Sequence, residues 1–584
     1  MEQSGYNCVN MFLPTTRQEM NLLGWDQLDV VLVTGDSYID SPYIGSAVIG
    51  KVLAQAGYRV GIIAQPEIDS GADICRLGEP VLFWGVTGGS VDSMVANYTA
   101  LKKKRKSDDY TPGGVNNRRP DRAVIAYSNL IRRFFKHTKP IVLGGIEASL
   151  RRIAHYDYWS DRIRGSVLFD AKADYLLYGL AEKSVLEMAV TLGAGALTNE
   201  NVQNVRGLCY IAKESREGYL DLPAYETVAE DKNAFIDMFH AFYHNNDPIT
   251  AKGLCQKHRD RYLIQNPPSL YVSQPELDAI YDLRYERLQH PYYEKQGKVT
   301  ALDTIQFSIS THRGCYGECN FCAIAVHEGR TVRWRSPESV LAEAKEITQH
   351  PAFKGYILDA GGPTANMYGF ECKKKLERGN CEKKRCTFPE ICPLLKIDHQ
   401  PQVKLLKQLR HIQGIKKVFV ASGIRYDLVL ADQSSGRDYL CEVLEHHVSG
   451  QMKIAPEHTE ERVLHFMGKP GKAALEKFKT QFDQISQQAG KHQFLTYYLI
   501  AAHPGCTEQN MVNLKRFTSR KLKINPEQVQ VFTPTPSTYS SLMYYTEMDP
   551  FTRAPIFVEK DLRQKARQKE IVTDKVSQRP TKNK

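Results

Sequence analysis

The stretch Ser310-Thr-His-Arg-Gly-Cys315-Tyr-Gly-Glu-Cys319-Asn-Phe-Cys322-Ala-Ile-Ala325 places three cysteines close together on the chain. A cubane cluster of four irons needs four ligands, and thiolates are its usual protein ligands. The next cysteine is Cys372, too far along to complete a local set. Cys315, Cys319 and Cys322 are therefore candidate ligands of a 4Fe–4S cluster in which one iron keeps an open position for chemistry.

A zinc site is the alternative interpretation of the same cysteines. Zinc sites with thiolate ligands usually pair two Cys-x-x-Cys units or add histidines at set spacings. His312 and His327 flank the loop, so spacing alone leaves a mixed zinc site open. The pattern farther along the chain fits the iron–sulfur interpretation independently.

Length and composition indicate a multidomain globular protein. The chain has 584 residues, of which 42% are hydrophobic and 24% charged, which predicts two or three domains. No apolar stretch approaches the roughly 18–20 residues that span a bilayer, and residues 1–8 do not resemble a secretory signal. Seven of the thirteen cysteines fall between residues 315 and 392, which favours metal chemistry in a reducing compartment over disulfides. We therefore expect a cytoplasmic protein without membrane contact.

The net charge of +11 lies partly in two basic stretches that we expect to be disordered. One is the run Lys102–Lys106, and the other is a tail over 556–584. Basic runs can bind nucleic acid, but they are more often solvated loops.

The N-terminal third alternates apolar runs with helical patterns. Strands are expected at residues 28–35, 58–64, 80–85, 140–145 and 173–179. Continuous apolar strands separated by helices imply a parallel sheet covered on both faces. We therefore predict a doubly wound, Rossmann-like domain over 1–200. The mixed segment 201–300 is expected to connect and wrap between domains.

The alternation restarts at Thr304. Six strands are expected, each followed by a helical pattern, at residues 304–310, 356–359, 417–421, 451–455, 494–500 and 528–532. This series predicts a partial (β/α)6 barrel over 301–555, with its chemistry at the carboxyl ends of the strands. The cysteine loop leaves the first of these ends.

The cysteine spacing, with Phe321 just before the last cysteine, resembles the signature of the radical S-adenosylmethionine (SAM) superfamily. Longer motifs resemble the YgiQ family of that superfamily and extend over roughly residues 10–555. They are Leu13-Pro-Thr-Thr-Arg17, Val33-Thr-Gly-Asp-Ser-Tyr-Ile-Asp40, Arg313-Gly-Cys315, Ser422-Gly-Ile-Arg425-Tyr-Asp427, Lys453-Ile-Ala-Pro-Glu-His458 and Gln530-Val-Phe-Thr-Pro-Thr-Pro-Ser-Thr-Tyr-Ser-Ser-Leu-Met-Tyr-Tyr-Thr546.

The resemblance implies a 4Fe–4S cluster that cleaves S-adenosylmethionine reductively to a 5′-deoxyadenosyl radical, with an electron donor such as flavodoxin or ferredoxin. It implies no substrate. Gly361 and Gly362 match a glycine turn that approaches the methionine ammonium of SAM, since only glycine permits such close backbone approach. Arg425 would suit the cofactor carboxylate, and Glu457 ribose hydroxyls or substrate. Cys506 is a candidate hydrogen donor, with a buried structural thiol as the alternative.

The N-terminal domain resembles the cobalamin-binding domain that precedes many radical enzymes. The lower-ligand motif Asp-x-His-x-x-Gly would fall on Asp40–Gly45, where Pro42 replaces the histidine and cannot ligate cobalt. We therefore favour a Rossmann-like domain for substrate or partner contacts over a cobalamin site.

A second group of cysteines lies in a polar insertion over 366–398, and we expect it to bind zinc or an auxiliary iron–sulfur cluster. Its members are Cys372, Cys381, Cys386 and Cys392, with unligated thiols as the alternative. Four basic or histidine side chains near the first loop could tune the cluster, contact an anionic substrate or be ordinary surface charges. They are His312, Arg313, Arg330 and Arg333.

The most specific function that these patterns support is a radical SAM enzyme of unknown substrate. RNA, a peptide and a metabolite all remain open as substrates. The competing class is a non-catalytic zinc or iron–sulfur protein that binds RNA through basic runs and aromatics.

Overall fold

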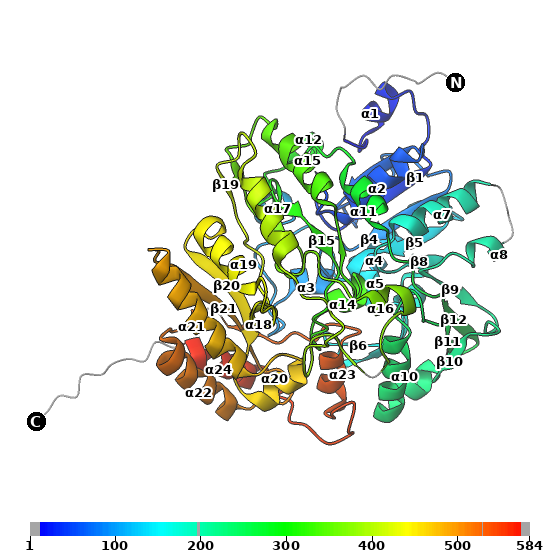
Figure 1. The fold of residues 1–584 in the computed structure, drawn as a ribbon. Coiled ribbons are helices and arrows are strands. Elements are labelled where there is room, and N and C mark those ends of the chain that lie inside the picture. The colour runs from blue at the N-terminus through cyan, green and yellow to red at the C-terminus, as the bar shows by residue number, and fades with distance from the viewer. Residues whose placement is uncertain (1–11, 195–198, 383, 528, 574–584) are drawn as a thin grey trace, which may run out of the picture.

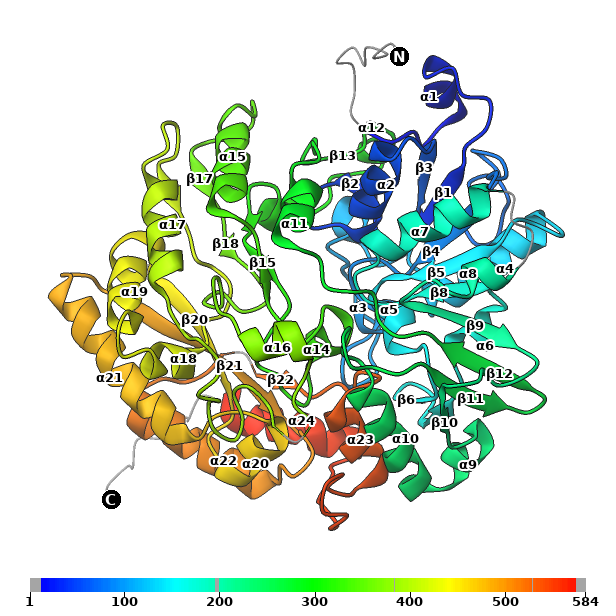
Figure 2. The same cartoon turned by 45° about the vertical axis from the view of Figure 1, so that its right-hand side comes forward.

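The computed structural model describes residues 12–194, 199–382, 384–527 and 529–573. Two α/β units lie side by side in it (Figures 1 and 2). In Figure 2 the N-terminal unit, blue to teal, is on the right, and the second unit, green to orange, is on the left.

The N-terminal unit is built on five parallel strands in the order β3-β1-β4-β5-β8. Counted along the chain this order is 2-1-3-4-5, the doubly wound order of flavodoxin-like folds. These strands are almost wholly apolar and buried, as expected for strands with helices on both faces. They are β1 (Val30–Thr34), β3 (Val60–Ala64), β4 (Phe83–Thr87), β5 (Ile141–Gly144) and β8 (Tyr175–Leu177).

Two hydrophobic cores cover the two faces of this sheet. Helices α2 (Gly45–Gln55) and α7 (Glu182–Gly193) pack on one face, and α4 (Ala123–Phe134) and α6 (Val167–Ala171) pack on the other. Alternate residues of each strand enter the two cores, as the twofold period of a strand requires. The predicted doubly wound domain is confirmed.

The prediction of a connecting segment over 201–300 is wrong for most of that range. Four further strands extend the same sheet, beginning with β9, which runs antiparallel to β8. β10, β11 and β12 are outer strands with exposed positions, so they lack the continuous apolar run of a central strand, whereas β9 is apolar throughout. The four strands are β9 (Leu208–Ala212), β10 (Leu220–Leu222), β11 (Leu254–His258) and β12 (Arg261–Gln265).

Only the end of that range wraps back over the N-terminal unit. Strand β13 (Leu288–Gln289) pairs with β2 (Ile39–Asp40), and helices α11 (Gln274–Tyr281) and α12 (Pro291–Glu294) flank it.

The second unit is the predicted partial barrel. Its strand segments pair in parallel, β14 with β18, β17 with β19, β20 with β21, and β21 with β22. Ile424 bridges Ile454, which joins the third strand region to the fourth. Their bounds are β14 (Ile309–Ser310), β17 (Tyr356–Ile357), β18 (Ala360–Gly361), β19 (Lys417–Val418), β20 (Gln451–Glu457), β21 (Phe494–Ala501) and β22 (Gln530–Val531).

Helices alternate with these strands. They are α15 (Pro337–Thr348), α17 (Gln400–Arg410), α18 (Tyr426–Ala431), α19 (Gly436–Glu442), α20 (Glu461–Met467), α21 (Lys472–Gln488) and α22 (Glu508–Phe517). Ser336 caps α15 by accepting a hydrogen bond from the Ser339 amide, as the Ser-Pro start predicts. Buried ion pairs join the parts of the molecule: Arg313 binds Glu182 of the N-terminal unit, and Glu343 binds Arg287 of the wrapping segment as well as Arg335 of its own unit.

The two basic stretches expected to be disordered are ordered where the structure describes them. The Lys102–Lys106 run lies in turns held by bridges from Tyr98 to Lys104 and from Ser107 to Val115. The tail forms helix α24 (Leu562–Thr573), which packs on α22. Residues 574–584 lie outside the described ranges. Within those ranges no helix is long and apolar enough to cross a membrane.

Candidate functional site

The cysteine loop leaves the first barrel strand, as predicted, and ends in helix α14 (Ile324–His327). Before the loop, β15 (His312–Arg313) pairs with β16 (Arg333–Trp334), which fixes where the loop begins. Within it, the Cys322 amide donates to the Cys319 carbonyl at 3.0 Å, and the Gly317 amide donates to Cys315 Sγ at 3.3 Å.

The side chains around Gly317 are packed too closely for a larger residue there. A Cβ on Gly317 would lie 3.1 Å from Cys315 Sγ, 3.8 Å from Cys319 Sγ and 2.9 Å from Arg425 Nη1. Among the described residues no three His, Cys, Asp or Glu side chains form a ready site for a metal ion. A cubane places its ligands on different irons, so its thiolates stand wider apart than those around a single ion. Three thiolates on one short loop form a donor set that fits a cluster with one open iron.

Arg425 extends the site at the third strand end. Its guanidinium makes paired bonds to Asp427, at 2.7 and 2.5 Å, and its Nη1 lies 4.0 Å from Cys319 Sγ. Its amide donates to Asn366 Oδ1 at 2.8 Å, and the Asn366 side chain donates back to the Arg425 carbonyl at 3.0 Å. Arg425 is thus held rigidly beside the predicted cluster.

Glu457 lies in the same group of charges, at the fourth strand end. It is buried, and Lys469 Nζ is 3.9 Å from its Oε1. Burial raises the pKa of Glu457, while Lys469 and Arg425 oppose that rise. The structure therefore brings the predicted Arg425 and Glu457 together and adds Lys469 to them.

Gly361 and Gly362 form the turn after the second strand, as predicted. A Cβ on Gly362 would lie 2.6 Å from His312 Nε2, so the close contact there needs glycine. The Gly361 carbonyl accepts bonds from the Thr311 amide and hydroxyl. This turn continues to Thr364, whose Oγ1 is 3.4 Å from Cys315 Sγ, so it lies against the cysteine loop.

A cavity of about 460 Å³ lies between the carboxyl ends of the N-terminal strands and this side of the barrel. Its floor is apolar and includes Leu32, Val86 and Leu143. Its barrel wall includes Gly361, Gly362, Pro363, Ser422, Asp359, His312, Arg313, His327 and Glu328. Doubly wound folds bind ligands at this edge, where the strand order reverses.

The charged groups in this cavity are mostly acidic. Arg313 is paired with Glu182, with Nη1 and Oε1 2.5 Å apart. Glu328 accepts the Gly314 amide at 3.0 Å, and Asp359 accepts the Ala421 amide at 2.8 Å. Burial raises the pKa of both Glu328 and Asp359. Burial also lowers the pKa of His312 and of His327 to about 4, so both imidazoles are neutral at pH 7.

The second cysteine group is only partly gathered. Cys372 and Cys386 lie in one small apolar cluster, and Cys392 packs against it. Cys381 instead accepts a bond from Lys374 Nζ at 2.9 Å. A metal at these four cysteines stays a prediction. The insertion does contact the first loop: Thr387 Oγ1 donates to the Gly317 carbonyl, and Arg385 Nη1 donates to Asn320 Oδ1 at 2.7 Å.

The remaining predicted residues have structural surroundings. Cys506 is fully buried, 3.4 Å from Met511 Sδ and 3.6 Å from His458 Nε2, which favours the structural thiol. Arg330 is buried and binds Glu318 at 3.3 Å, and Arg333 donates to the Val272 carbonyl. Neither is an ordinary surface charge.

The motif expected to carry a cobalt ligand offers none. Pro42 lines the cavity, and Asp40 is paired with Lys51 at 2.9 Å. The two nitrogens of His312 already face Thr311 and Thr364. The residues at this motif do not fit a histidine-ligated cobalamin.

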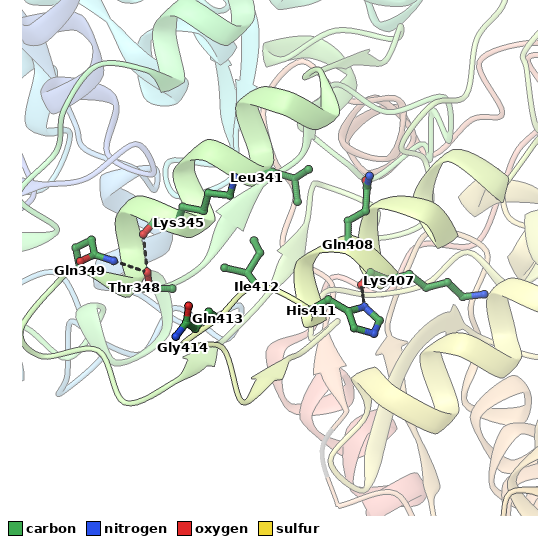
Figure 3. Close-up of a pocket in the computed structure, with 10 residues that line it drawn as sticks. All are labelled: Leu341, Lys345, Thr348, Gln349, Lys407, Gln408, His411, Ile412, Gln413 and Gly414. Carbon is green, nitrogen blue, oxygen red and sulfur yellow. Dashed lines mark hydrogen bonds between the residues drawn. The ribbon is translucent and has the colours of Figure 1, made fainter.

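A second hollow lies elsewhere on the barrel. A groove of about 1030 Å³ runs between helices α15 and α17 and is lined by residues such as Lys345 and His411 (Figure 3). It contains none of the predicted site residues, so it is not the catalytic centre.

Known relatives match the chain over almost its whole length. A UPF0313 protein of Fusobacterium nucleatum is 60% identical over 565 residues, covering 97% of this chain and 99% of the relative. One from Thermotoga maritima is 46% identical over 563 residues, covering 96% and 98%. Residues 12–308 match the profile of the family described as Radical SAM N-terminal. The chain belongs to the UPF0313 family.

This UPF0313 protein is accordingly a radical SAM enzyme, and the predicted YgiQ resemblance is confirmed. Among solved structures, TsrM, a radical SAM methyltransferase from Kitasatospora setae with cobalamin and a [4Fe–4S] cluster bound, has a TM-score of 0.51 and 15% identity. The match covers 93% of this chain and 82% of TsrM, and it supports the fold alone.

Proposed function

We propose that this UPF0313 protein binds a 4Fe–4S cluster on Cys315, Cys319 and Cys322 and cleaves S-adenosylmethionine reductively. The observation that carries the proposal is the three-cysteine loop, which leaves the first strand end of a barrel in a radical SAM family member. When bound, the cluster would supply the electron that breaks the sulfonium bond and yields the 5′-deoxyadenosyl radical, which takes hydrogen from a substrate carbon.

The chain's own residues would bind, orient and shield. Arg425, fixed by Asp427, places positive charge beside Cys319 and is positioned for the cofactor carboxylate. Gly361 and Gly362 line the cavity wall, where their backbone groups would face the methionine part of the cofactor. Glu457, next to Lys469, is placed for ribose hydroxyls.

The reaction also needs an electron donor. A protein such as flavodoxin or ferredoxin would supply the electron. Cys372, Cys381, Cys386 and Cys392 would hold a second metal, zinc or an auxiliary cluster. Membership of a radical SAM family favours catalysis over the competing class, a non-catalytic RNA-binding protein.

The test is release of 5′-deoxyadenosine. The protein is reconstituted anaerobically with iron and sulfide, reduced with dithionite and given S-adenosylmethionine, and the product is measured by mass spectrometry. We expect release from the wild type and from Cys75→Ala, whose cysteine is exposed outside the loop, and none from Cys319→Ala. An iron-loaded wild type that releases no 5′-deoxyadenosine would refute the proposal.

A further inference from the structure

We propose that the 460 Å³ cavity between the N-terminal sheet and the barrel is the substrate site. We further infer that it takes a small ligand with an apolar body and a cationic, amine-like head. The inference rests on the proposed function for its chemistry, because the cofactor turn Gly361-Gly362 forms part of the cavity wall.

The size and position of the cavity suit one small molecule held beside the cofactor site. Ligand pockets are typically about 300–1,000 Å³ and lie where the strand order of a doubly wound sheet reverses. Here the order reverses between β1 and β4, and both strands contribute lining residues. Arg313, two residues before Cys315, also lines the cavity. A ligand on this floor would therefore face the predicted source of the radical.

The floor specifies an apolar body. Side chains of the strands and of α2 and α7 form it, among them Leu32, Phe83, Val86, Leu143 and Val185. These side chains belong to the buried cores of the N-terminal unit, so the floor is held rigidly. A polar or highly charged body would lose its hydration there without replacement.

The charged residues that line the cavity indicate the charge of the ligand's head group. Among the described residues that line the cavity, four are carboxylates and one is a cation, Arg313. Asp36 is neutralised by Arg119, and Glu182 by Arg313. The hydrogen bonds to Glu328 and Asp359 come only from backbone amides and a hydroxyl, while Arg313 acts on Glu328 and Lys453 on Asp359 electrostatically. A ligand cation would supply the direct ion pair that these two lack, whereas a phosphate or carboxylate would be repelled.

Glu182 provides an independent sign of a missing partner. It is more than nine-tenths buried, it lines the cavity, and its Oε2 has no hydrogen-bond partner among the residues that the structure describes. A buried carboxylate oxygen left without a donor costs free energy, and an ammonium group would satisfy it.

Binding of two matched probes to the protein without cluster tests this inference. 2-Naphthylethylamine and 2-naphthylacetate share a ring and carry opposite charges, and their affinities are measured by titration calorimetry. We expect the amine to bind at least about tenfold more tightly than the acid. Glu182→Gln should reduce that preference by about tenfold, with its melting temperature checked in parallel.

Two variants fill the cavity without disturbing the backbone. A Cβ on Gly45 meets nothing within 4 Å, and one on Gly144, in extended backbone, meets only the Leu177 carbonyl at 3.8 Å. Gly45→Leu and Gly144→Val should each weaken amine binding by about tenfold or more. Gly193→Leu, at the exposed C-terminal end of α7, is the matched control and should leave binding unchanged.

Equal binding of the two probes, tighter binding of the acid, or amine binding that survives in both filled variants would overturn the inference. Displacement of the amine by S-adenosylmethionine or by hydroxocobalamin would assign the cavity to a cofactor and would also overturn it. Because the readout is binding without the cluster, these results are independent of 5′-deoxyadenosine release.

Discussion

Gly317 is closely surrounded by side-chain atoms inside the cysteine loop. Its neighbours, Cys315 Sγ and Arg425 Nη1, lie 3.1 and 2.9 Å from where a Cβ would stand. Gly317→Ala should therefore lower iron loading by about tenfold, since small displacements of groups around ligands cost that much affinity. Absorbance near the iron–sulfur charge-transfer band and iron content after reconstitution measure this.

Gly423 is the matched control, because a Cβ there meets nothing within 4 Å although Gly423 lies in the same site region. Gly423→Ala should load iron as the wild type does. If Gly317→Ala loads iron normally, the cluster does not depend on the close packing around Gly317.

The contribution of Glu19 to the stability of the protein should depend on pH. Burial would raise its pKa, but bonds from His290, Thr15 and Thr16 outweigh burial and lower the pKa from 4.5 to about 2. The stability from Glu19 is therefore full above about pH 4.5 and is lost as pH falls toward 2. Glu19→Gln should remove roughly 1–2 kcal/mol at pH 7 and flatten the acid side of the unfolding curve.

Chemical unfolding between pH 2 and 7 measures this contribution, with Glu187→Gln on the exposed side of α7 as the control. If Glu19→Gln and the control lose stability equally as the pH falls, the ionic cap is not present in solution.

At the residue scale, the sequence locates groups that lie on one local motif. Cys315, Cys319 and Cys322 are close in sequence, and Arg425 and Glu457 end predicted strands. Lys469, Thr364 and Glu182 were missed. Lys469 lies just beyond α20, and Glu182 comes from the other unit, so only tertiary pairing brings them to the site. The Gly-Gly-Pro-Thr364 run was the one local signal available for Thr364.

Helix α24 closes the barrel beneath strand β21. Gln568 is buried there, where its Oε1 accepts the Ala502 amide at 2.9 Å and its Nε2 donates to the Cys506 carbonyl at 3.2 Å. Gln568→Ala leaves both backbone groups without a partner, so it should destabilise the protein by about 1–3 kcal/mol. Thermal unfolding should show a lower midpoint.

Gln564 lies one turn earlier on α24, near the start of the helix, and is exposed. Gln564→Ala should leave the midpoint unchanged. Equal midpoints for both variants would mean that α24 does not dock on the barrel.

The elements that sequence analysis misjudged share one property. The outer strands β10–β12 and helix α24 carry exposed or charged residues, so their local pattern resembles loop or tail. Long-range contacts give them structure: β12 pairs with β9, and Val572 and Gln568 pack into the barrel. The central strands, buried on both faces, were predictable because their apolar runs are continuous.

The two units are joined by a buried ion triad at the scale of the whole molecule. Glu343 on α15 binds Arg335 beside it and Arg287 from the wrapping segment, and all three are buried. Removing the carboxylate leaves two buried arginines without a counter-charge. Glu343→Gln should therefore cost about 3–5 kcal/mol and split the unfolding transition of the two units.

Calorimetry of Glu343→Gln against Glu346→Gln, an exposed position on the same helix, measures this effect. A single transition with unchanged midpoint in Glu343→Gln would refute the role of the triad in coupling the units.

The central claim is that three thiolates leave one iron open to S-adenosylmethionine. Mössbauer spectroscopy of the protein reconstituted with 57Fe tests it most directly. We expect a 4Fe–4S spectrum in which about one quarter of the signal, from one iron of four, shifts when S-adenosylmethionine is added. A protein that retains zinc instead of iron, or a cluster whose four irons are all unaffected by S-adenosylmethionine, would contradict the claim.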